Sequence, residues 1–418
     1  MAKIINKNLL SRNVLEKLDK SQLIDRVLQL EAHNFQLKQI IKKTDNASNN
    51  IKTDAVKRNF DFTKCQKRHV FMKLSYLGWD YQGFVVQEDF VNTIEHYLFA
   101  ALIKSCLIES RETSNYHRCG RTDKGVSAFS QVISIDIRSR LDLVKQGSLI
   151  DEIPYCKILN RLLPKNIRCI CWAPVGDMIS ARFNCNWRGY KYFFPRGNLN
   201  IDLMNEAIQY AIGKHDFRNL CKMDVGNGVV NFSRDIIEAQ VVCLTKECDL
   251  RNSAYDMCEF SIKSNAFLWH QIRCIMGILF LVGYGQEKPE IIKDLLDIEK
   301  CPEKPQYNIA HYIPLNLFYS YYNDVNWNID KEEIQKVIKD LQEEWTCAAI
   351  KCTMTRSMLT NLETLLDDKS VSLNFQTDCL MQGVKRKIYQ PLMQRQRCES
   401  LEKRIEHYAK KRRLAKTS

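Results

Sequence analysis

The order of strand-like and helix-like patterns between residues 69 and 322 is the feature that most limits the folds open to this chain. The first unit reads strand, helix, strand, helix, strand, strand, and runs from HVFMKLSYL at His69 to RGYKYFF at Arg188. The second unit reads helix, two strands, an unusually apolar helix from Phe267, a shorter helix from Pro289 and the strand LNLFYSYY. Two mixed units of similar order predict an α+β fold in which helices cover one face of a sheet.

Shifts in composition along the 418 residues predict the domain organisation. In the first 43 residues Leu23, Leu30 and Leu37 recur every seven positions; a short parallel coiled coil and a single amphipathic helix packed on its own domain both fit this pattern. The predicted segments are a helical region at 1–43, a flexible polar linker at 44–66, two α/β halves at 67–197 and 198–325, and a helical, partly disordered, basic extension at 326–418.

Several element boundaries can be predicted from local signals. Thr93 is a suitable N-cap for the first helix of the first unit, and Glu95 in its first turn suits the helix dipole. The first helix of the second unit, NIDLMNEAIQYAIGK, is expected to end at Gly213. The strand after Gly125 alternates apolar and polar residues as far as Ser139, which predicts that only one of its faces is buried.

Charge and cysteine content narrow the classes of function. The net charge of +13 favours a polyanionic partner, either nucleic acid or an anionic membrane. The membrane alternative is weak, because no apolar run approaches the roughly 18 residues of a spanning helix and MAKIINKNLLSRN has no signal-peptide core. The 17 cysteines include no Cys-x-x-Cys pair, which favours a reducing compartment. Because the sequence also has no Gly-rich nucleotide loop and no His-Glu-x-x-His motif, we expect no cofactor and no metal.

One carboxylate stands out in the stretch RCGRTDKGVSAFSQ. Asp123 lies between Arg121 and Lys124, and Gly120 and Gly125 on either side are expected to let the backbone turn sharply. The two cations favour the ionised carboxylate, which suits a nucleophile or a charge stabiliser better than a general acid. The alternative is a surface turn in which the aspartate caps the backbone.

A cation stands out in the apolar helix FLWHQIRCIMGILFLVGYG. Arg273 needs a partner if it is buried there, and a carboxylate is the natural one. The alternative is that Arg273 lies on the solvated stripe of the helix.

Together these stretches resemble the TruA-type tRNA pseudouridine synthases. GRTDKGVSA resembles the catalytic loop of that family, YLGWDYQGF its first-strand motif, and RGYKY and the helix with HQIR its second and third motifs. FFPRGNLNID, GKHDFRNLCKMDVGNGVVNFSR and KPQY look most like the eukaryotic members that act at tRNA positions 38 and 39. The resemblance implies a pseudouridine synthase fold, with two ferredoxin-like halves sharing a continuous mixed sheet. It also implies a cofactor-free isomerisation of uridine on tRNA by a homodimer.

The resemblance further implies roles for individual residues. Asp123 would be the nucleophile, and Arg121 would help to hold the target nucleotide out of the stack. Tyr190, which is easily confused with Tyr192, would pack against the flipped base, and Arg273 would form an ion pair with Asp123. Four more residues of these motifs are candidates for contacts with the RNA: Arg118, Lys124, Arg188 and His270.

The chemistry fits such residues. Isomerisation breaks the N1–C1′ bond and makes a C5–C1′ bond, so a carboxylate must attack or stabilise an electron-poor C1′ while a closed pocket keeps water away. The alternatives are a synthase for another tRNA position, a non-catalytic tRNA-binding protein or chaperone on the same fold, and, more remotely, a glycoside hydrolase, which normally needs two carboxylates. We expect the protein in the nucleus, the cytoplasm or both, since the run Lys410 to Arg413 could serve nuclear import or phosphate contact.

Overall fold

The computed structural model describes residues 60–86, 92–141, 149–244, 254–366, 375–383 and 388–417. The chain divides into two compact units, Met1–Phe60 and Asp61–Ser418. The predicted N-terminal helix and its coiled-coil alternative lie outside the described residues, and so does the predicted linker as far as residue 59. The end of that linker is described: Phe62–Lys64 form a short 3-10 helix. The remaining description concerns the second unit.

The first half is a βαββαβ unit. Its strands have the spatial order β4-β1-β3-β2, which is the antiparallel ferredoxin-like arrangement. Thr93 caps the first helix as predicted, because its side chain accepts a hydrogen bond from the backbone N–H of His96. The elements are β1 (Gln66–Tyr76), α3 (Ile94–Lys104), β2 (His117–Arg118), β3 (Ser127–Ser139), α4 (Tyr155–Leu162) and β4 (Ile167–Pro174).

The second half repeats the same βαββαβ order. Its strands lie in the order β9-β5-β8-β7, with β6 added at the edge next to β7. The prediction that its first helix ends at Gly213 is wrong, because that helix stops at Gln209 and Gly213 begins β6. The elements are β5 (Trp187–Pro195), α5 (Ile201–Gln209), β6 (Gly213–Asp216), β7 (Ser233–Cys243), β8 (Met257–Ser264), α7 (Gln271–Gly283), α8 (Ile291–Leu296) and β9 (Leu315–Tyr321).

The two halves join at β3. Within the described residues nine strands form one sheet, and the junction is a short parallel pairing of Ser127 and Ala128 with Asn316 and Leu317 of β9. Farther along the same edge of β3, β2 pairs with residues 133 and 134. The β2–β3 connection therefore leaves the sheet where β2 ends and β9 begins. This connection contains the predicted catalytic loop.

The helices of both halves share one hydrophobic core, which confirms the predicted α+β fold. Inward-facing residues of α3, α4, α5 and α7 pack in a single cluster with alternate residues of β1, β3, β5 and β8. On the opposite face a smaller cluster contains Phe71, Cys119, Val132 and Tyr322. Ser134 is also fully buried, so the prediction of a half-buried β3 is wrong. This strand is central in the sheet and is covered on both faces.

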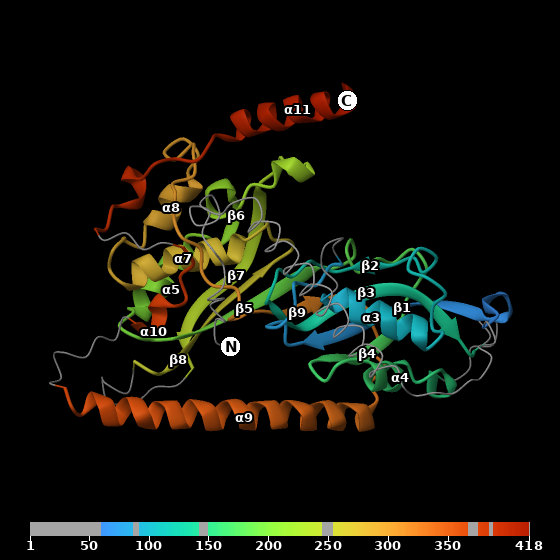
Figure 1. Cartoon of the computed structure of the whole chain (residues 1–418). Helices are drawn as coiled ribbons and strands as arrows, with labels where there is room; N and C mark the ends of the chain where they lie inside the picture. Colours follow the sequence, from blue (N-terminus) through green and yellow to red (C-terminus); the bar gives the residue numbers. More distant parts are fainter. Residues whose placement is uncertain are drawn as a thin grey trace, which may run out of the picture. The chain divides into compact units, whose positions relative to one another are not determined.

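Beyond residue 326 the chain forms α9 (Lys331–Glu363), which is 33 residues long, followed by α10 (Phe375–Asp378) and α11 (Leu401–Thr417). Asp330 caps α9 by accepting hydrogen bonds from the backbone N–H groups of Glu332 and Glu333. The helix lies within the extension that was predicted to be helical, and no proline or glycine interrupts it. In Figure 1, α9 passes along both halves.

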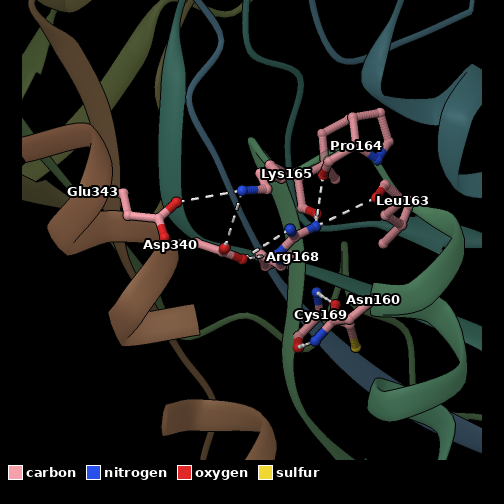
Figure 2. Close-up of polar contacts among 9 residues, drawn as sticks. Asn160, Leu163, Pro164, Lys165, Arg168, Cys169, Asp340 and Glu343 are labelled. Atoms are coloured by element: carbon pink, nitrogen blue, oxygen red, sulfur yellow. Dashed lines mark hydrogen bonds and ion pairs between the residues drawn. The ribbon is translucent and has the colours of Figure 1, made fainter. Parts of the chain in front are cut away.

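Ion pairs attach the start of α9 to the first half. Arg168 of β4 donates from Nε (3.1 Å) and Nη2 (2.9 Å) to Oδ2 of Asp340, while its Nη1 donates to the carbonyl of Pro164 at 2.7 Å (Figure 2). Lys165 forms a further ion pair with Glu343 at 3.3 Å. Because the Arg168 side chain is only 11% exposed, this anchor is a partly desolvated charge pair.

The far end of α9 is attached to the second half. Tyr255 donates a hydrogen bond to Glu363 at 2.5 Å, and the guanidinium of Arg356 lies 3.5 Å from the Tyr255 ring centroid. The helix therefore braces both halves. Of the helices described, none combines the length and the apolar character needed to cross a membrane.

Candidate active site

The loop between β2 and β3 is held by neighbours on all sides. Gly125 has φ +73°, and a Cβ there would lie 2.3 Å from the ring of Tyr312, so only glycine fits. A Cβ on Gly78, in the first-strand motif, would lie 2.0 Å from the carbonyl oxygen of Val126. Gly120 has open space around it and no positive φ, so its backbone conformation does not require glycine.

Buried polar groups fix the loop further. The carbonyl of Thr122 accepts a hydrogen bond from the backbone N–H of Phe84 at 3.1 Å. The hydroxyl of Thr122 forms a hydrogen bond with the hydroxyl of Tyr76 at 2.7 Å. Gln131, fully buried on β3, donates to the carbonyl of Gly120 at 2.9 Å. The backbone on both sides of Asp123 is thus fixed before any substrate binds.

The carboxylate of Asp123 is half-exposed and faces α7. Its Oδ2 lies 3.2 Å from Nε2 of His270. Arg121 and Lys124 were predicted to flank this carboxylate, but both are exposed, and no ion pair joins either to Asp123 within the described part of the chain. Residues adjacent in an extended loop point in different directions, which is why the sequence neighbours are not the spatial ones.

Arg273 is 4% exposed, so the alternative that it lies on a solvated stripe is wrong. Its Nε donates to the carbonyl of Ala310 at 2.9 Å and its Nη2 to Oε1 of Gln382 at 2.5 Å. The predicted direct ion pair with Asp123 is not formed between these described side chains. Instead, Nη1 of Arg273 lies 3.3 Å from Nε2 of His270. Burial lowers the pKa of Arg273, and the nearby charge of Asp123 opposes this shift.

His270 thus stands between the two charged groups. Its backbone is in the left-handed region (φ +57°), which is uncommon for a non-glycine residue and marks a constrained position. If Nε2 carries a proton it donates to Asp123; if it does not, it accepts from Arg273. Nε2 cannot donate and accept at the same time, so the presence of a proton on Nε2 determines whether His270 forms a hydrogen bond with Asp123 or with Arg273.

Tyr190 of β5 lies beside this group. Its ring packs edge-on against Phe267, with centroids 5.2 Å apart and planes at 86°. Burial raises the pKa of the Tyr190 phenol, and the charge of Asp123 adds to the rise. Tyr192 lies on the same side of the strand but is fully buried and is influenced by Arg273 rather than by Asp123. Of the two tyrosines, Tyr190 is therefore the one close to the loop.

Three of the four predicted RNA contacts bind protein groups in the structure: His270, described above, and Arg118 and Arg188. Arg118 donates to Glu95, a fully buried carboxylate on α3, at 2.7 Å. Arg188 donates to the carbonyls of Cys119 (2.9 Å) and Asn265 (2.5 Å), and it connects the loop to the segment before α7. Burial alone would raise the pKa of the Cys119 thiol, but its hydrogen-bonded neighbours and Arg188 hold that pKa below its usual range. Lys124 remains exposed.

The structure adds two residues that the sequence patterns did not indicate. Gln382 reaches Arg273 from the C-terminal region, whose short patterns gave no signal. Tyr312 lies under Gly125 and also stacks near Arg273, with 5.6 Å between the guanidinium and the ring centroid. In the described ranges, no group of three or more His, Cys, Asp or Glu residues is arranged to hold a metal ion.

Comparison with known proteins places this site in a family. The chain is 45% identical to the tRNA pseudouridine(38/39) synthases of Mus musculus and Homo sapiens, over 96% of this chain and 90% and 89% of theirs. This chain belongs to the tRNA pseudouridine synthase family. Residues 207–323 match the family model described as tRNA pseudouridine synthase. The enzyme of the same name in Saccharomyces cerevisiae is 39% identical over 77% of this chain and 74% of its own.

Family membership explains the arrangement of the site. A pseudouridine synthase is an isomerase that must hold a uridine outside its stack while the glycosidic bond is exchanged. The loop with Asp123 lies at the junction of the two ferredoxin-like halves, and Tyr190 provides an aromatic wall next to it.

Proposed function

We propose that this protein converts uridine to pseudouridine at positions 38 and 39 of the anticodon stem-loop of tRNA. The observation that carries the proposal is the position of Asp123, on a fixed loop at the junction of the halves, with its carboxylate held by His270 and a buried Arg273 behind it. The names of the relatives from Mus musculus and Homo sapiens support the choice of positions.

In this proposal Asp123 attacks or stabilises C1′ of the ribose while the N1–C1′ bond breaks. The freed uracil stays against Tyr190 and turns so that C5 bonds to C1′, which releases the Asp123 carboxylate; C5 then loses its proton and N1 takes one up. Arg121 is exposed, with no partner among the described residues, and is available to hold the extruded nucleotide. Extrusion costs a few kcal/mol and is easiest in a loop or at the edge of its stem, where positions 38 and 39 lie.

The test is to map pseudouridine site by site in unmodified tRNA after incubation with the wild-type protein and with Asp123→Asn. We expect product at positions 38 and 39 from the wild type alone. Asp177→Asn, which removes the charge of an exposed aspartate in the same half, serves as the matched control. Product from Asp123→Asn would overturn the catalytic assignment, product at other positions would overturn the choice of site, and tRNA binding without any product would favour a chaperone.

We further propose that the protein is a homodimer and that α9 contributes to the contact. Apolar residues recur at heptad spacing on its outward side, which is typical of a helix–helix seam. Ile338, Leu341, Trp345, Leu359 and Leu362 keep this spacing, and Trp345 is 71% exposed. Ile350, Met354 and Met358 are further exposed apolar residues of the same helix. A stripe of this kind is unusual on a monomer surface. Light scattering should give a dimer mass for the wild type and a monomer mass for Trp345→Glu; a wild-type monomer would overturn the proposal.

We also propose that the protein is present in the nucleus, the cytoplasm or both. The run of four cations from Lys410 to Arg413 supports this assignment. Imaging of a fluorescent fusion, with and without alanine at these four positions, tests it. An unchanged nuclear fraction would show that the run does not act in import.

A further inference from the structure

A second concave site lies beside the active site in the second half. It is a cavity of about 230 Å³, large enough for several water molecules or part of a nucleotide. Three segments far apart in the sequence line it: Cys221–Met223, Lys304–Tyr307, and the C-terminal residues Cys398 and Arg404. The C-terminal segment is part of the fold here, because the backbone N–H of Cys398 donates to the carbonyl of Lys304 at 2.7 Å.

The wall of this cavity carries three cations and no carboxylate. Lys222, Lys304 and Arg404 line it, and within the described residues none of them forms an ion pair; Nζ of Lys304 donates a hydrogen bond to the carbonyl of Cys221 at 2.6 Å. The Nε of Arg404 is buried without a hydrogen-bond partner among those residues. Three cations in one concavity focus a positive potential, and a buried N–H donor without an acceptor is costly. Both observations point to an anionic ligand.

The remaining walls suit a nucleotide rather than a bare ion. Tyr307 is aromatic and Lys304 lies over its ring, with 4.5 Å between Nζ and the centroid. Met223 and Pro305 add apolar surface. An aromatic and apolar wall beside a cluster of cations is the combination that binds a base or ribose together with its phosphate.

The cavity is connected to the active site through one residue. The backbone N–H of Lys222 donates to the carbonyl of Trp269 at 2.9 Å, and Nζ of Lys222 lies 4.1 Å from the centroid of the Trp269 ring. Trp269 is 40% exposed and directly precedes His270, the partner of Asp123. A strand of RNA with one nucleotide at Asp123 would therefore pass Trp269 on its way to the cavity.

We propose that this cavity is a subsite for a second nucleotide of the tRNA substrate, whose phosphate is bound by Lys222, Lys304 and Arg404. The proposal rests on the proposed function, because it takes tRNA as the ligand. It explains why the C-terminal segment packs against the second half: Arg404, on the first turn of α11, completes the cation cluster.

The test compares Arg404→Gln with Lys403→Gln, which removes the same charge from the adjacent, exposed position outside the cavity. Binding of unmodified tRNA is measured in the Asp123→Asn background, so that the result does not depend on turnover. We expect about tenfold weaker binding for Arg404→Gln, with the slope of log Kd against log salt reduced by about 0.7 to 0.9, as for one lost phosphate contact. Lys403→Gln should behave like the parent, and equal weakening by both variants would overturn the subsite.

The phosphate itself is identified with anticodon-arm RNAs that carry a single neutral methylphosphonate linkage. At one linkage near the target uridine, the neutral group should weaken binding to the parent protein but cause no further loss with Arg404→Gln. If the methylphosphonate and Arg404→Gln weaken tRNA binding additively at every linkage tested, the proposal is overturned. The proposal is also overturned if inorganic phosphate or uridine monophosphate stabilises the protein only when Arg404 is present, while Arg404→Gln leaves the affinity for tRNA unchanged. The cavity would then bind a free anion. Failure of the proposed function would appear separately, as absent product at positions 38 and 39 with Arg404-dependent binding intact.

Discussion

Replacing Gln382 with alanine is the sharpest test of how the site is held together. The substitution removes the acceptor 2.5 Å from Nη2 of the buried Arg273, while Ala310 and His270 remain. A hydrogen bond to a charged group contributes about 1.5–3 kcal/mol. Because Gln382 is only half-buried, a water molecule can partly replace the lost hydrogen bond. We therefore expect the free energy of unfolding to fall by an amount near the lower end of this range, about 1.5 kcal/mol. If the weaker positioning of Arg273 and His270 raises the activation free energy by the same amount, kcat should fall about tenfold.

Urea denaturation measures the free energy of unfolding, and single-turnover formation of pseudouridine measures the effect on chemistry. Gln286→Ala is the matched control, because that glutamine is exposed in the same half and no side-chain hydrogen bond to it is found in the described chain. If Gln382→Ala matches Gln286→Ala in both assays, Arg273 does not depend on this contact and the reasoning is refuted.

Three further predictions follow from the same structure. Gly125→Ala should destabilise the fold by more than about 1 kcal/mol in urea, because φ is positive and the Tyr312 ring occupies the space; an unchanged free energy of unfolding would contradict the close approach of that ring. Asp340→Ala should cost about 2–3 kcal/mol, since it leaves Arg168 partly buried without its carboxylate, and a double-mutant cycle with Arg168→Met should show coupling. Desolvation raises the pKa of the buried Glu152, but hydrogen bonds to its carboxylate lower that pKa below the ordinary value of about 4.5. The ionised carboxylate therefore stabilises the fold above pH 4.5, and this contribution to the free energy of unfolding is lost as the pH falls through the pKa of the folded state. In Glu152→Gln the free energy of unfolding should depend less on pH in this acid range.

Much of the fold could be predicted from the sequence because its signals are local. Alternating strands and the Thr93 cap depend on near neighbours, and the repeated order of elements indicated two similar halves. Burial of both faces of β3 could not be predicted, because it depends on the loop at 175–185, which covers the second face from another part of the chain. The prediction of a helical, partly disordered extension at 326–418 did not give the bounds of α9, because Ala348, Cys352 and Thr355 interrupt the spacing of large apolar residues.

In the candidate site, too, residues in local motifs could be predicted, and contacts between distant parts of the chain could not. Asp123 and Tyr190 lie in short motifs, which is why the sequence could indicate both as candidates; their roles stay predictions. The prediction of a direct ion pair between Asp123 and Arg273 is wrong, because a sequence motif does not give the distance between two elements and His270 occupies the space between them. Gln382 has no motif at all: its importance arises only from the path of the chain after α9.

That path has a consequence for how the protein is made. Arg273 is separated from Gln382 by 109 positions, so the arginine leaves the ribosome well before its hydrogen-bond acceptor has been synthesised. The same holds for Lys304 and its backbone partner at Cys398. Both halves can form their sheets during synthesis, but in a chain interrupted before residue 382 the Arg273 guanidinium would lack its Gln382 acceptor and keep only its contacts with Ala310 and His270. A premature stop codon in this region should therefore give a protein that retains most of its fold but has lost one of the contacts that hold Arg273.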